Sequence, residues 1–197
     1  WFMTDGSVRG GISWDDLCRI QLPVPSYERQ LDVVESYRAI TRRIAMKKEI
    51  NDNLLATAQV IYKSWFVDYE PFELDDEGSP IGWIKTTLDK KLTTSTQSVN
   101  PQKLQEDYVW HYSIPAYDNE HLPTLDVPSS ILSNKYLVPD NAILVSKLNP
   151  DTKRIWRTLS CFEDAICSTE FIVFSSKVPS HRAFYYLMFN TKSFTDF

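Results

Sequence analysis

The sequence is poor in the residues that build metal centres and catalytic relays. Its 197 residues include three histidines and three cysteines, and the cysteines (Cys18, Cys161 and Cys167) show no metal-ligand spacing. An odd number of cysteines also fits a reducing compartment better than a disulfide framework. We therefore expect no metal site, no disulfide framework and a cytoplasmic location.

Other absences exclude further classes of protein. No apolar run approaches the roughly 18 to 20 residues of a membrane span, and no signal peptide is visible, so we expect no membrane association. No Gly-x-Gly loop opens a βα unit, and the Asn/Asp-Pro-Pro-Tyr/Phe tetrapeptide of DNA amino-methyltransferases is missing. The Asp…Glu-x-Lys pattern of nucleases is missing as well. The sequence thus predicts a protein that is not an enzyme and binds no cofactor of its own.

Negative charge is concentrated in one stretch. The formal net charge is −5, and six acidic residues but no basic ones lie between Asp68 and Glu77. Without those six carboxylates the net charge would be +1. Phosphate contacts supply much of the affinity of DNA-binding proteins, so the position of the charge matters more than its sum. The rest of the chain is close to neutral and does not exclude a nucleic-acid partner.

One segment carries a long helical pattern. Ser26 follows the run LPVP and is placed to cap a helix, and Glu28 is placed to complement the helix dipole. Neither glycine nor proline occurs from there to Phe66, so we predict a helix over residues 26–66, about 60 Å long at 1.5 Å per residue. Apolar residues recur along it at spacings of three and four: Val33, Tyr37, Ile40, Ile44, Leu54, Ala58, Ile61 and Trp65.

Such a helix cannot bury its apolar stripe alone. The same spacing places Lys47 and Asn51 between Ile44 and Leu54, so the stripe is polar at its middle. We expect the helix to pair antiparallel with a second helix of its kind. In that coiled coil, Lys47 and Asn51 would fix the register at some cost in stability. Packing of the helix on its own domain is the alternative.

From residue 81 onward the pattern changes to short β-like runs separated by turn residues. A last helix is expected at His181–Asn190, with Ser180 as its cap. The predicted fold class is α+β, a mostly-β and irregular domain with a few helices, joined to the long helix by an acidic linker over residues 67–80. The expected strands are Ile84–Leu88, Tyr108–Ile114, Ala142–Ser146, Ile155–Leu159 and Phe171–Phe174.

Several runs also carry a resemblance to a known family. In chain order they are LPVPSYERQLDVV, INDNLLATAQVIYKSWFVDYEPF, PIGWIKTTLDKKL, SIPAYDN, SNKYLV, ILVSKLNPDTKRIW and ICSTEFIVF. They resemble the specificity subunits of type I restriction–modification systems. The first two are similar to the start and the far end of the spacer helix of that family. The others resemble the opening and the body of a target recognition domain, so the resemblance covers nearly the whole chain.

The resemblance implies a non-catalytic subunit that reads one half of a bipartite site on double-stranded DNA. It also implies modification subunits, which carry the S-adenosylmethionine chemistry and dock on the long helix, and restriction subunits that join the complex. Residues 81–197 would be a target recognition domain, and residues 1–25 the C-terminal tail of one. That tail either closes onto its own chain, giving a half-subunit that works as a homodimer, or belongs to a preceding domain.

Two segments are the expected DNA contacts. In the resembled family a Gly-Ser loop with a basic residue lies against DNA, which points to Ser7 and Arg9, with a plain turn as the alternative. The second segment is a basic turn after residue 146, where a solvated surface loop is the alternative. By geometry, asparagine suits adenine, arginine suits guanine and lysine suits phosphate. The expected contacts in this turn are Lys147, Asn149, Lys153, Arg154 and Arg157. Tyr117, Asp118 and Asn119 form a third, weaker candidate, for which a structural turn is the stronger interpretation.

A protein-only scaffold is the rival hypothesis. The predicted helix carries seven basic and five acidic residues, a balance that suits a protein partner better than nucleic acid. A scaffold would have no DNA affinity, whereas a specificity subunit would bind protein through the helix and DNA through the domain. A fused restriction–modification enzyme is the remaining alternative, and the missing catalytic motifs argue against it.

Overall fold

The computed structural model describes residues 13–149, 151–159, 162, 164–192 and 194. It divides into two units, residues 1–54 and 55–197. The first unit contains α1 (Trp14–Cys18) and most of α2 (Tyr27–Phe66), and the second contains the end of α2 and all the strands. Ser7 and Arg9 lie outside the described residues, so the contacts expected of them stay predictions.

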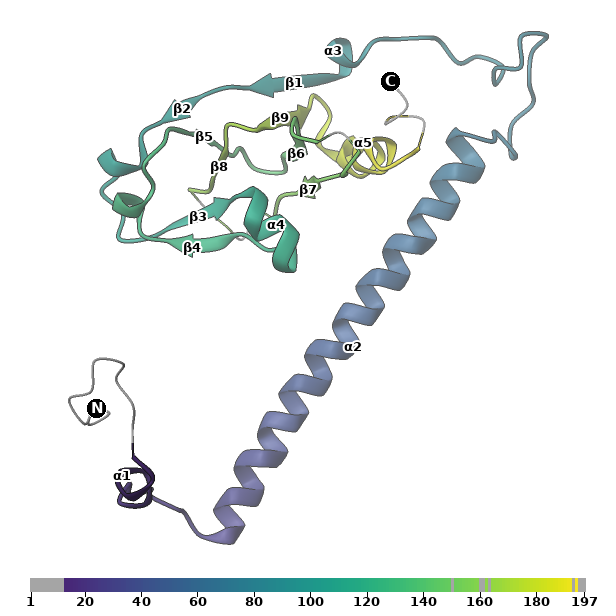
Figure 1. Cartoon of the computed structure of the whole chain (residues 1–197). Coiled ribbons are helices and arrows are strands. Elements are labelled where there is room, and N and C mark those ends of the chain that lie inside the picture. Colours follow the sequence, from purple (N-terminus) through teal and green to yellow (C-terminus); the bar gives the residue numbers. More distant parts are fainter. Residues whose placement is uncertain (1–12, 150, 160–161, 163, 193, 195–197) are drawn as a thin grey trace. The chain divides into compact units, whose positions relative to one another are not determined.

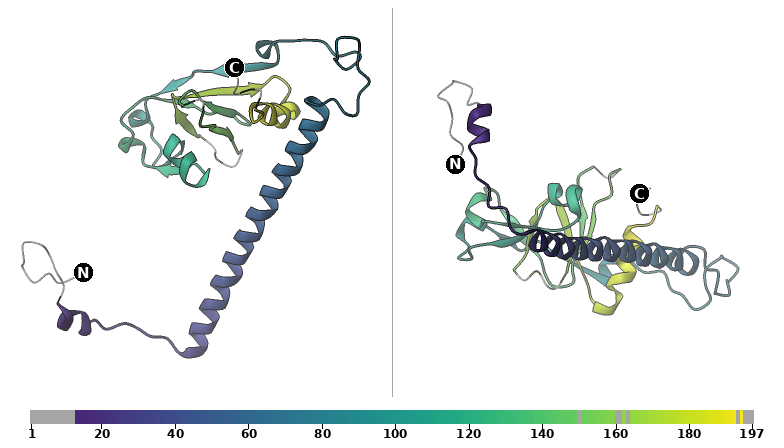
Figure 2. Two further views of the ribbon diagram at one scale, coloured as in Figure 1. Left: turned by 45° about the vertical axis from the view of Figure 1, so that its right-hand side comes forward. Right: turned by 90° about the horizontal axis from the view of Figure 1, so that it is seen from below.

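The predicted long helix is confirmed. Figures 1 and 2 show α2 as one unbroken helix, and it spans 40 residues. Ser26 caps it as expected: its Oγ accepts a hydrogen bond from the N–H of Arg29 (3.4 Å), and its carbonyl oxygen accepts one from the N–H of Gln30 (3.0 Å). Because no glycine or proline interrupts the segment, nothing in it breaks the hydrogen-bond ladder before Phe66.

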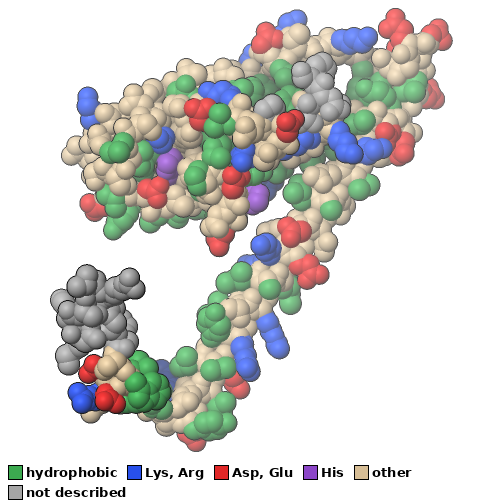
Figure 3. All heavy atoms as spheres, viewed as in Figure 1, with side chains coloured by type: hydrophobic (Ala, Val, Ile, Leu, Met, Phe, Trp, Pro, Cys, Tyr) green, Lys and Arg blue, Asp and Glu red, His purple; other side chains and the backbone are tan. Residues whose placement is uncertain are grey.

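The apolar stripe of α2 is open to solvent. Ala58 is half-buried, and the other apolar members have exposed fractions between 47% and 68%: Val33, Tyr37, Ile40, Ile44, Leu54, Ile61 and Trp65. None of the described residues among 13–54 is buried. On the face shown in Figure 3, α2 presents hydrophobic side chains together with basic and acidic ones. The stripe is therefore accessible to a partner.

The second unit is built on two sheets (Figure 1). The first is antiparallel throughout, and in spatial order it contains β1 (Leu92–Ser95), β9 (Phe171–Ser176), β6 (Ile143–Ser146) and β7 (Ile155–Arg157). In the second, β3 pairs with β8 in parallel and the other pairs are antiparallel. Its order is β2 (Ser98–Val99), β5 (Lys135–Leu137), β8 (Ile166–Ser168), β3 (Val109–Tyr112) and β4 (Thr124–Asp126). The observed fold class is α+β, as predicted.

Short helices complete the second unit. They are α3 (Leu88–Lys91), α4 (Ile114–Glu120) and α5 (Arg182–Phe189), with 3-10 turns at Pro101–Lys103, Pro128–Ser130 and Pro179–His181. The prediction of a strand at Ile84–Leu88 is wrong: residues 84–87 are irregular, and Leu88 begins α3. The edge strand β1 starts only at Leu92, where the chain reaches β9 and can pair with it.

Helix α4 begins at Ile114, where the expected strand Tyr108–Ile114 was predicted to end. Pro115 lies in the first turn of this helix. A proline is favoured there because the N–H that it lacks would have no partner within the helix. Ser113 caps α4, its Oγ accepting a hydrogen bond from the N–H of Ala116 (3.2 Å). The preceding strand therefore ends at Tyr112, two residues earlier than expected.

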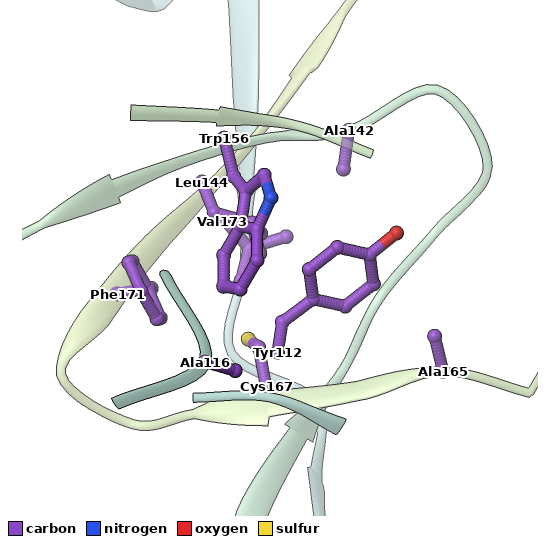
Figure 4. Close-up of a cluster of buried hydrophobic side chains, with 9 residues drawn as sticks. All are labelled: Tyr112, Ala116, Ala142, Leu144, Trp156, Ala165, Cys167, Phe171 and Val173. Carbon is purple, nitrogen blue, oxygen red and sulfur yellow. The ribbon is translucent and has the colours of Figure 1, made fainter. Parts of the chain in front are cut away.

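Side chains of the antiparallel sheet alternate between two cores. Leu144 and Trp156 point into one core, which the sheet shares with the five-stranded sheet (Figure 4), whereas Ile143 and Ile155 point into another, which α5 covers. Successive residues of a strand face opposite sides, so this sheet is buried on both faces. The first core also contains Tyr112, Ala116, Ala142, Ala165, Cys167, Phe171 and Val173, and the second contains Leu92, Tyr185 and Phe189.

Aromatic contacts dominate the first core. The rings of Tyr112 and Trp156 lie 4.7 Å apart and perpendicular, an arrangement that favours both quadrupoles (Figure 4). Burial raises the pKa of Cys167 to about 12, so its side chain remains a protonated thiol and acts as a small apolar core residue.

An aromatic cluster fixes the last turns of α2 to α5, within the second unit. Phe184 of α5 packs against Tyr62 (ring centroids 5.3 Å apart) and Phe66 (4.9 Å). Trp83 packs against Phe66 (5.8 Å) and Phe72 (5.1 Å), so the acidic stretch is folded back on the helix end. Burial is the main reason that the pKa of Tyr62 rises to about 12. This end of α2 therefore belongs structurally to the domain.

Candidate nucleic-acid interface

The basic turn predicted to contact DNA connects β6 and β7. These strands pair antiparallel, and the N–H of Ser146 donates to the carbonyl oxygen of Arg154 (2.9 Å) at the base of the turn. Within it, the N–H of Thr152 donates to the carbonyl oxygen of Asn149 (2.8 Å). Asn149 has a φ of 48°, in the left-handed region that asparagine adopts more readily than most residues. The hairpin thus presents an exposed loop on a rigid base.

Lys147 and Arg157 keep their charges at the surface. The ammonium of Lys147 lies 6.0 Å from the ring centroid of Tyr136, and the guanidinium of Arg157 lies 5.8 Å from that of Tyr186. Both side chains are exposed. Contact with an aromatic face restricts the motion of each side chain without neutralising its positive charge. Of the predicted contacts, these two are therefore available to an anionic ligand.

Arg182 adds to this positive charge and was missed by the sequence analysis. Its Nη1 donates to the carbonyl oxygen of Thr158 (2.9 Å), just beyond β7. Burial lowers the pKa of Arg182, and the nearby charge of Arg157 lowers it further. The only sequence signal for Arg182 was a basic residue at the start of the predicted last helix, which does not reveal the contact with Thr158.

Lys153 has a structural partner. Its Nζ donates to the carbonyl oxygens of Asn190 (3.3 Å) and Thr191 (2.6 Å), just after the end of α5. The last carbonyl groups of a helix lack hydrogen-bond donors within the helix and carry partial negative charge. The Lys153 ammonium supplies both a donor and a positive charge at this helix end. A DNA contact by Lys153 stays a prediction; the contacts of this side chain stabilise α5.

Arg154 is bound to Asp118 of α4. Its Nε and Nη2 donate to the two carboxylate oxygens over 2.7 Å and 2.9 Å. The Arg154 side chain is 11% exposed and that of Asp118 is 46% exposed. The pairing holds the pKa of Asp118 below its ordinary value and raises that of Arg154. Since the donors that would read guanine are occupied by Asp118, direct readout by Arg154 stays a prediction that requires this pair to open.

Helix α4 is held on β7 by further contacts. Trp156 Nε1 donates to the carbonyl oxygen of His121 (3.0 Å), which ends α4 in a left-handed conformation. Tyr117 packs against Trp156 with ring centroids 5.2 Å apart. The third predicted segment, Tyr117 to Asn119, is thus part of a helix, not a turn, and it adjoins the basic turn. Asp118 and Asn119 are both exposed there.

No protein-family model matches the chain. The type I restriction enzyme MjaIX specificity subunit of Methanocaldococcus jannaschii is 30% identical over 129 residues, which cover 61% of this chain and 29% of that protein. The type I restriction enzyme HindI specificity subunit of Haemophilus influenzae is 32% identical over 60 residues, covering 30% of this chain and 13% of that protein. The chain is thus similar in sequence to two type I specificity subunits.

The resemblance inferred from the motifs is thereby confirmed. The chain spans less than a third of the length of the two specificity subunits it matches. Among the residues that the structure describes, no helix is both long and apolar enough to cross a membrane. Within the same residues, His, Cys, Asp and Glu side chains do not gather into a group able to hold a metal ion.

Proposed function

We propose that this chain is a non-catalytic DNA-recognition module of a type I restriction–modification complex. It reads one half of a bipartite site on double-stranded DNA. The observation that carries the proposal is the sequence similarity to two type I specificity subunits. The fold supports it, because a 40-residue helix with an exposed stripe leads into a domain that presents a basic hairpin turn.

The β6–β7 turn and α4 form the proposed DNA-contact surface. Lys147 and Arg157 contact phosphates, since their charges are exposed. Asn149, at the exposed tip of the turn, has the amide geometry for an adenine edge. Arg154 contributes to this surface at least in part through its two hydrogen bonds to Asp118, which hold α4 beside the turn. Ser7 and Arg9 remain proposed contacts from the preceding segment.

The long helix is the proposed protein-binding element. Its apolar stripe pairs antiparallel with the same helix of a second copy, which gives a homodimer with two recognition domains. The remaining faces of the helix, with balanced charge, dock modification subunits, and restriction subunits join that assembly. The modification subunits bind S-adenosylmethionine and carry out the methyl transfer in the cytoplasm, and this chain selects the DNA sequence that is methylated.

Co-expression with a type I modification subunit from the same organism tests this proposal. We expect the two proteins to copurify, and we expect methylated bases mapped across the host genome to appear at one bipartite motif only when this chain is present. Failure to copurify, or methylation that is the same with and without the chain, would contradict the proposal. A protein-only scaffold predicts copurification without any sequence-dependent methylation.

A further inference from the structure

Two arginine side chains meet where the end of β7 lies beside the start of α5. Arg182, the first residue of α5, donates from Nη1 to the carbonyl oxygen of Thr158 (2.9 Å), the residue directly after Arg157. The Arg157 guanidinium lies 5.8 Å from the ring centroid of Tyr186. Tyr186 is four residues after Arg182 and therefore lies on the same face of α5, one turn further along. Both guanidinium groups are thus held in one small area between β7 and α5.

The charges of this pair are not neutralised within the part of the chain that the structure describes. Among those residues, no carboxylate forms an ion pair with Arg157 or Arg182. The first turn of α5, which the structure describes in full, contains no acidic residue, and the helix dipole disfavours a positive charge there. Burial lowers the pKa of Arg182, and the charge of Arg157 lowers it further. Without an anion, each guanidinium therefore makes the other less favourable.

We propose that Arg157 and Arg182 together bind a single phosphate group of the DNA backbone. The inference rests on the proposed DNA-recognition function, to which it adds Arg182 as a contact residue and the sharing of one phosphate by two arginines. A phosphate between two guanidinium groups accepts charge-assisted hydrogen bonds from both and removes the repulsion between them. Arg157 is exposed and Arg182 is half-buried, so the area is open to such a ligand.

The position of the pair along β7 suits a DNA ligand. Arg157 lies three residues beyond Arg154, the residue at the base of the basic turn, which corresponds to about 10 Å at 3.3 Å per residue. The major groove of DNA is about 12 Å wide, and the phosphates of the two strands border it. The tip of the turn can therefore lie in the groove while the arginine pair contacts a phosphate at its border.

Thr158 and Tyr186 are the positioning residues of this site. Thr158 is 2% exposed, and both its Oγ1 (3.0 Å) and its N–H (3.1 Å) donate to the carbonyl oxygen of Ala142. The carbonyl group that accepts from Arg182 therefore belongs to a rigid part of the sheet. Tyr186 is packed against the core that α5 covers. Because both guanidinium groups are ordered before DNA binds, less conformational entropy is lost on binding.

Substitutions of Arg182 test the site in the full chain, assembled with its modification subunit. Arg182→Gln removes the charge but keeps a donor for the carbonyl group of Thr158, whereas Arg182→Lys keeps the charge. We expect Arg182→Gln to weaken binding to specific and nonspecific duplexes alike by about tenfold, and to make the slope of log affinity against log salt concentration shallower by about one. Arg182→Lys should keep the slope. Lys103→Gln, which removes an exposed charge elsewhere on the domain, should change neither quantity.

Two results of this experiment would overturn the inference. One is a salt slope for Arg182→Gln equal to that of the unaltered complex. The other is an equal loss of affinity in Arg182→Gln and Arg182→Lys together with a lower midpoint of urea denaturation in both, which would give Arg182 a structural role only. Failure of the proposed function is distinguishable, because the unaltered complex would then bind specific and scrambled duplexes equally while the salt slopes still decide the phosphate site.

Neutral methylphosphonate linkages, placed one at a time in a bound duplex, test whether the two arginines share a phosphate. We expect one linkage that weakens binding by the unaltered complex and has no further effect on Arg157→Gln or Arg182→Gln. Insensitivity at different linkages in the two variants would overturn the shared site.

Free phosphate is the other source of the same chemical group, and calorimetric titration of the chain with inorganic phosphate examines it. We expect no binding tighter than about 1 mM, because a single small anion makes few contacts. Tighter binding that Arg182→Gln abolishes, together with an unchanged salt slope for DNA, would assign the site to a free anion and overturn the inference.

Discussion

Arg154 on the β6–β7 turn holds Asp118 of α4 through two parallel hydrogen bonds, from Nε to Oδ1 (2.7 Å) and from Nη2 to Oδ2 (2.9 Å). This bidentate geometry is the one in which arginine and carboxylate interact most specifically. Arg154 Nη1 is buried with no hydrogen-bond partner among the described residues, so the guanidinium faces the protein more than the solvent. The contact joins two segments that the sequence predicts as separate DNA-contact candidates, the basic turn and Tyr117 to Asn119.

The first prediction concerns this pair. Arg154→Ala should lower the affinity of the assembled complex for its specific DNA by about tenfold or more, because α4 loses its anchor on the turn. Arg154→Lys, which keeps the charge but cannot form the fork, should lose nearly as much. Fluorescence anisotropy with a labelled specific duplex measures both variants. Unchanged binding by Arg154→Ala would remove Arg154 from the site, and full rescue by lysine would assign it a role through charge alone.

The second prediction concerns a phosphate contact. Lys147→Ala should weaken binding to specific and nonspecific duplexes alike, and the slope of log affinity against log salt concentration should become shallower by about one. Lys85→Ala serves as the matched control, since that lysine is exposed but lies outside the turn. A salt slope identical to that of the unaltered chain would exclude Lys147 from phosphate contact.

The third prediction concerns the core. Phe171 is completely buried in the core between the two sheets, so Phe171→Ala should lower the free energy of unfolding by about 3–5 kcal/mol through lost burial and the cavity left behind. Leu132 is 86% exposed, and Leu132→Ala should change stability by less than about 0.5 kcal/mol. Urea denaturation measures both values. Similar losses for the two variants would mean that the core is packed differently.

The fourth prediction concerns pH. His111 Nδ1 lies 2.8 Å from Asp126 Oδ2, and His111 Nε2 is buried with no hydrogen-bond partner among the described residues. Burial lowers the pKa of His111 below its ordinary value of 6.5, and this effect outweighs the opposite influence of Asp126. The unfolded chain therefore binds a proton at a pH where the folded chain does not. The contribution of the buried His111 to the free energy of unfolding is fully present above about pH 6.5, and it is lost as the pH drops below that value.

The variant His111→Asn isolates this effect, since its amide can still donate to Asp126 but does not titrate. Urea denaturation between about pH 7 and pH 5.5 should show a smaller loss of stability in the variant than in the unaltered chain. Equal losses would show that other groups cause the pH dependence.

Local signals predicted the long helix almost to the residue. The predicted range 26–66 differs from the observed Tyr27–Phe66 only by the capping residue, since the cap, the absence of glycine and proline, and the apolar spacing are all local. Strands β6, β7 and β9 were also predicted, because each contains a run of apolar residues. Short edge strands such as β2 (Ser98–Val99) lack such a pattern, since pairing with distant strands defines them.

The sequence predicted which residues belong to the candidate site, but it did not predict the contacts that these residues make. Its composition alone identified the turn after residue 146 as a basic surface, and the turn does lie between two paired strands. The contact between Arg154 and Asp118 bridges 36 positions, and that between Lys153 and Thr191 bridges 38. Contacts over such separations depend on how the sheets and helices pack, and one sequence does not contain that information in its local pattern.

Selection from a random library of double-stranded DNA tests the central claim most directly. The chain, assembled with its modification subunit, is incubated with the library, and the bound fraction is sequenced. The account predicts enrichment of one bipartite motif with two identical, inverted half-sites at a fixed separation, because two copies related by a two-fold axis present identical domains. A bound fraction with the same sequence composition as the input would contradict the account.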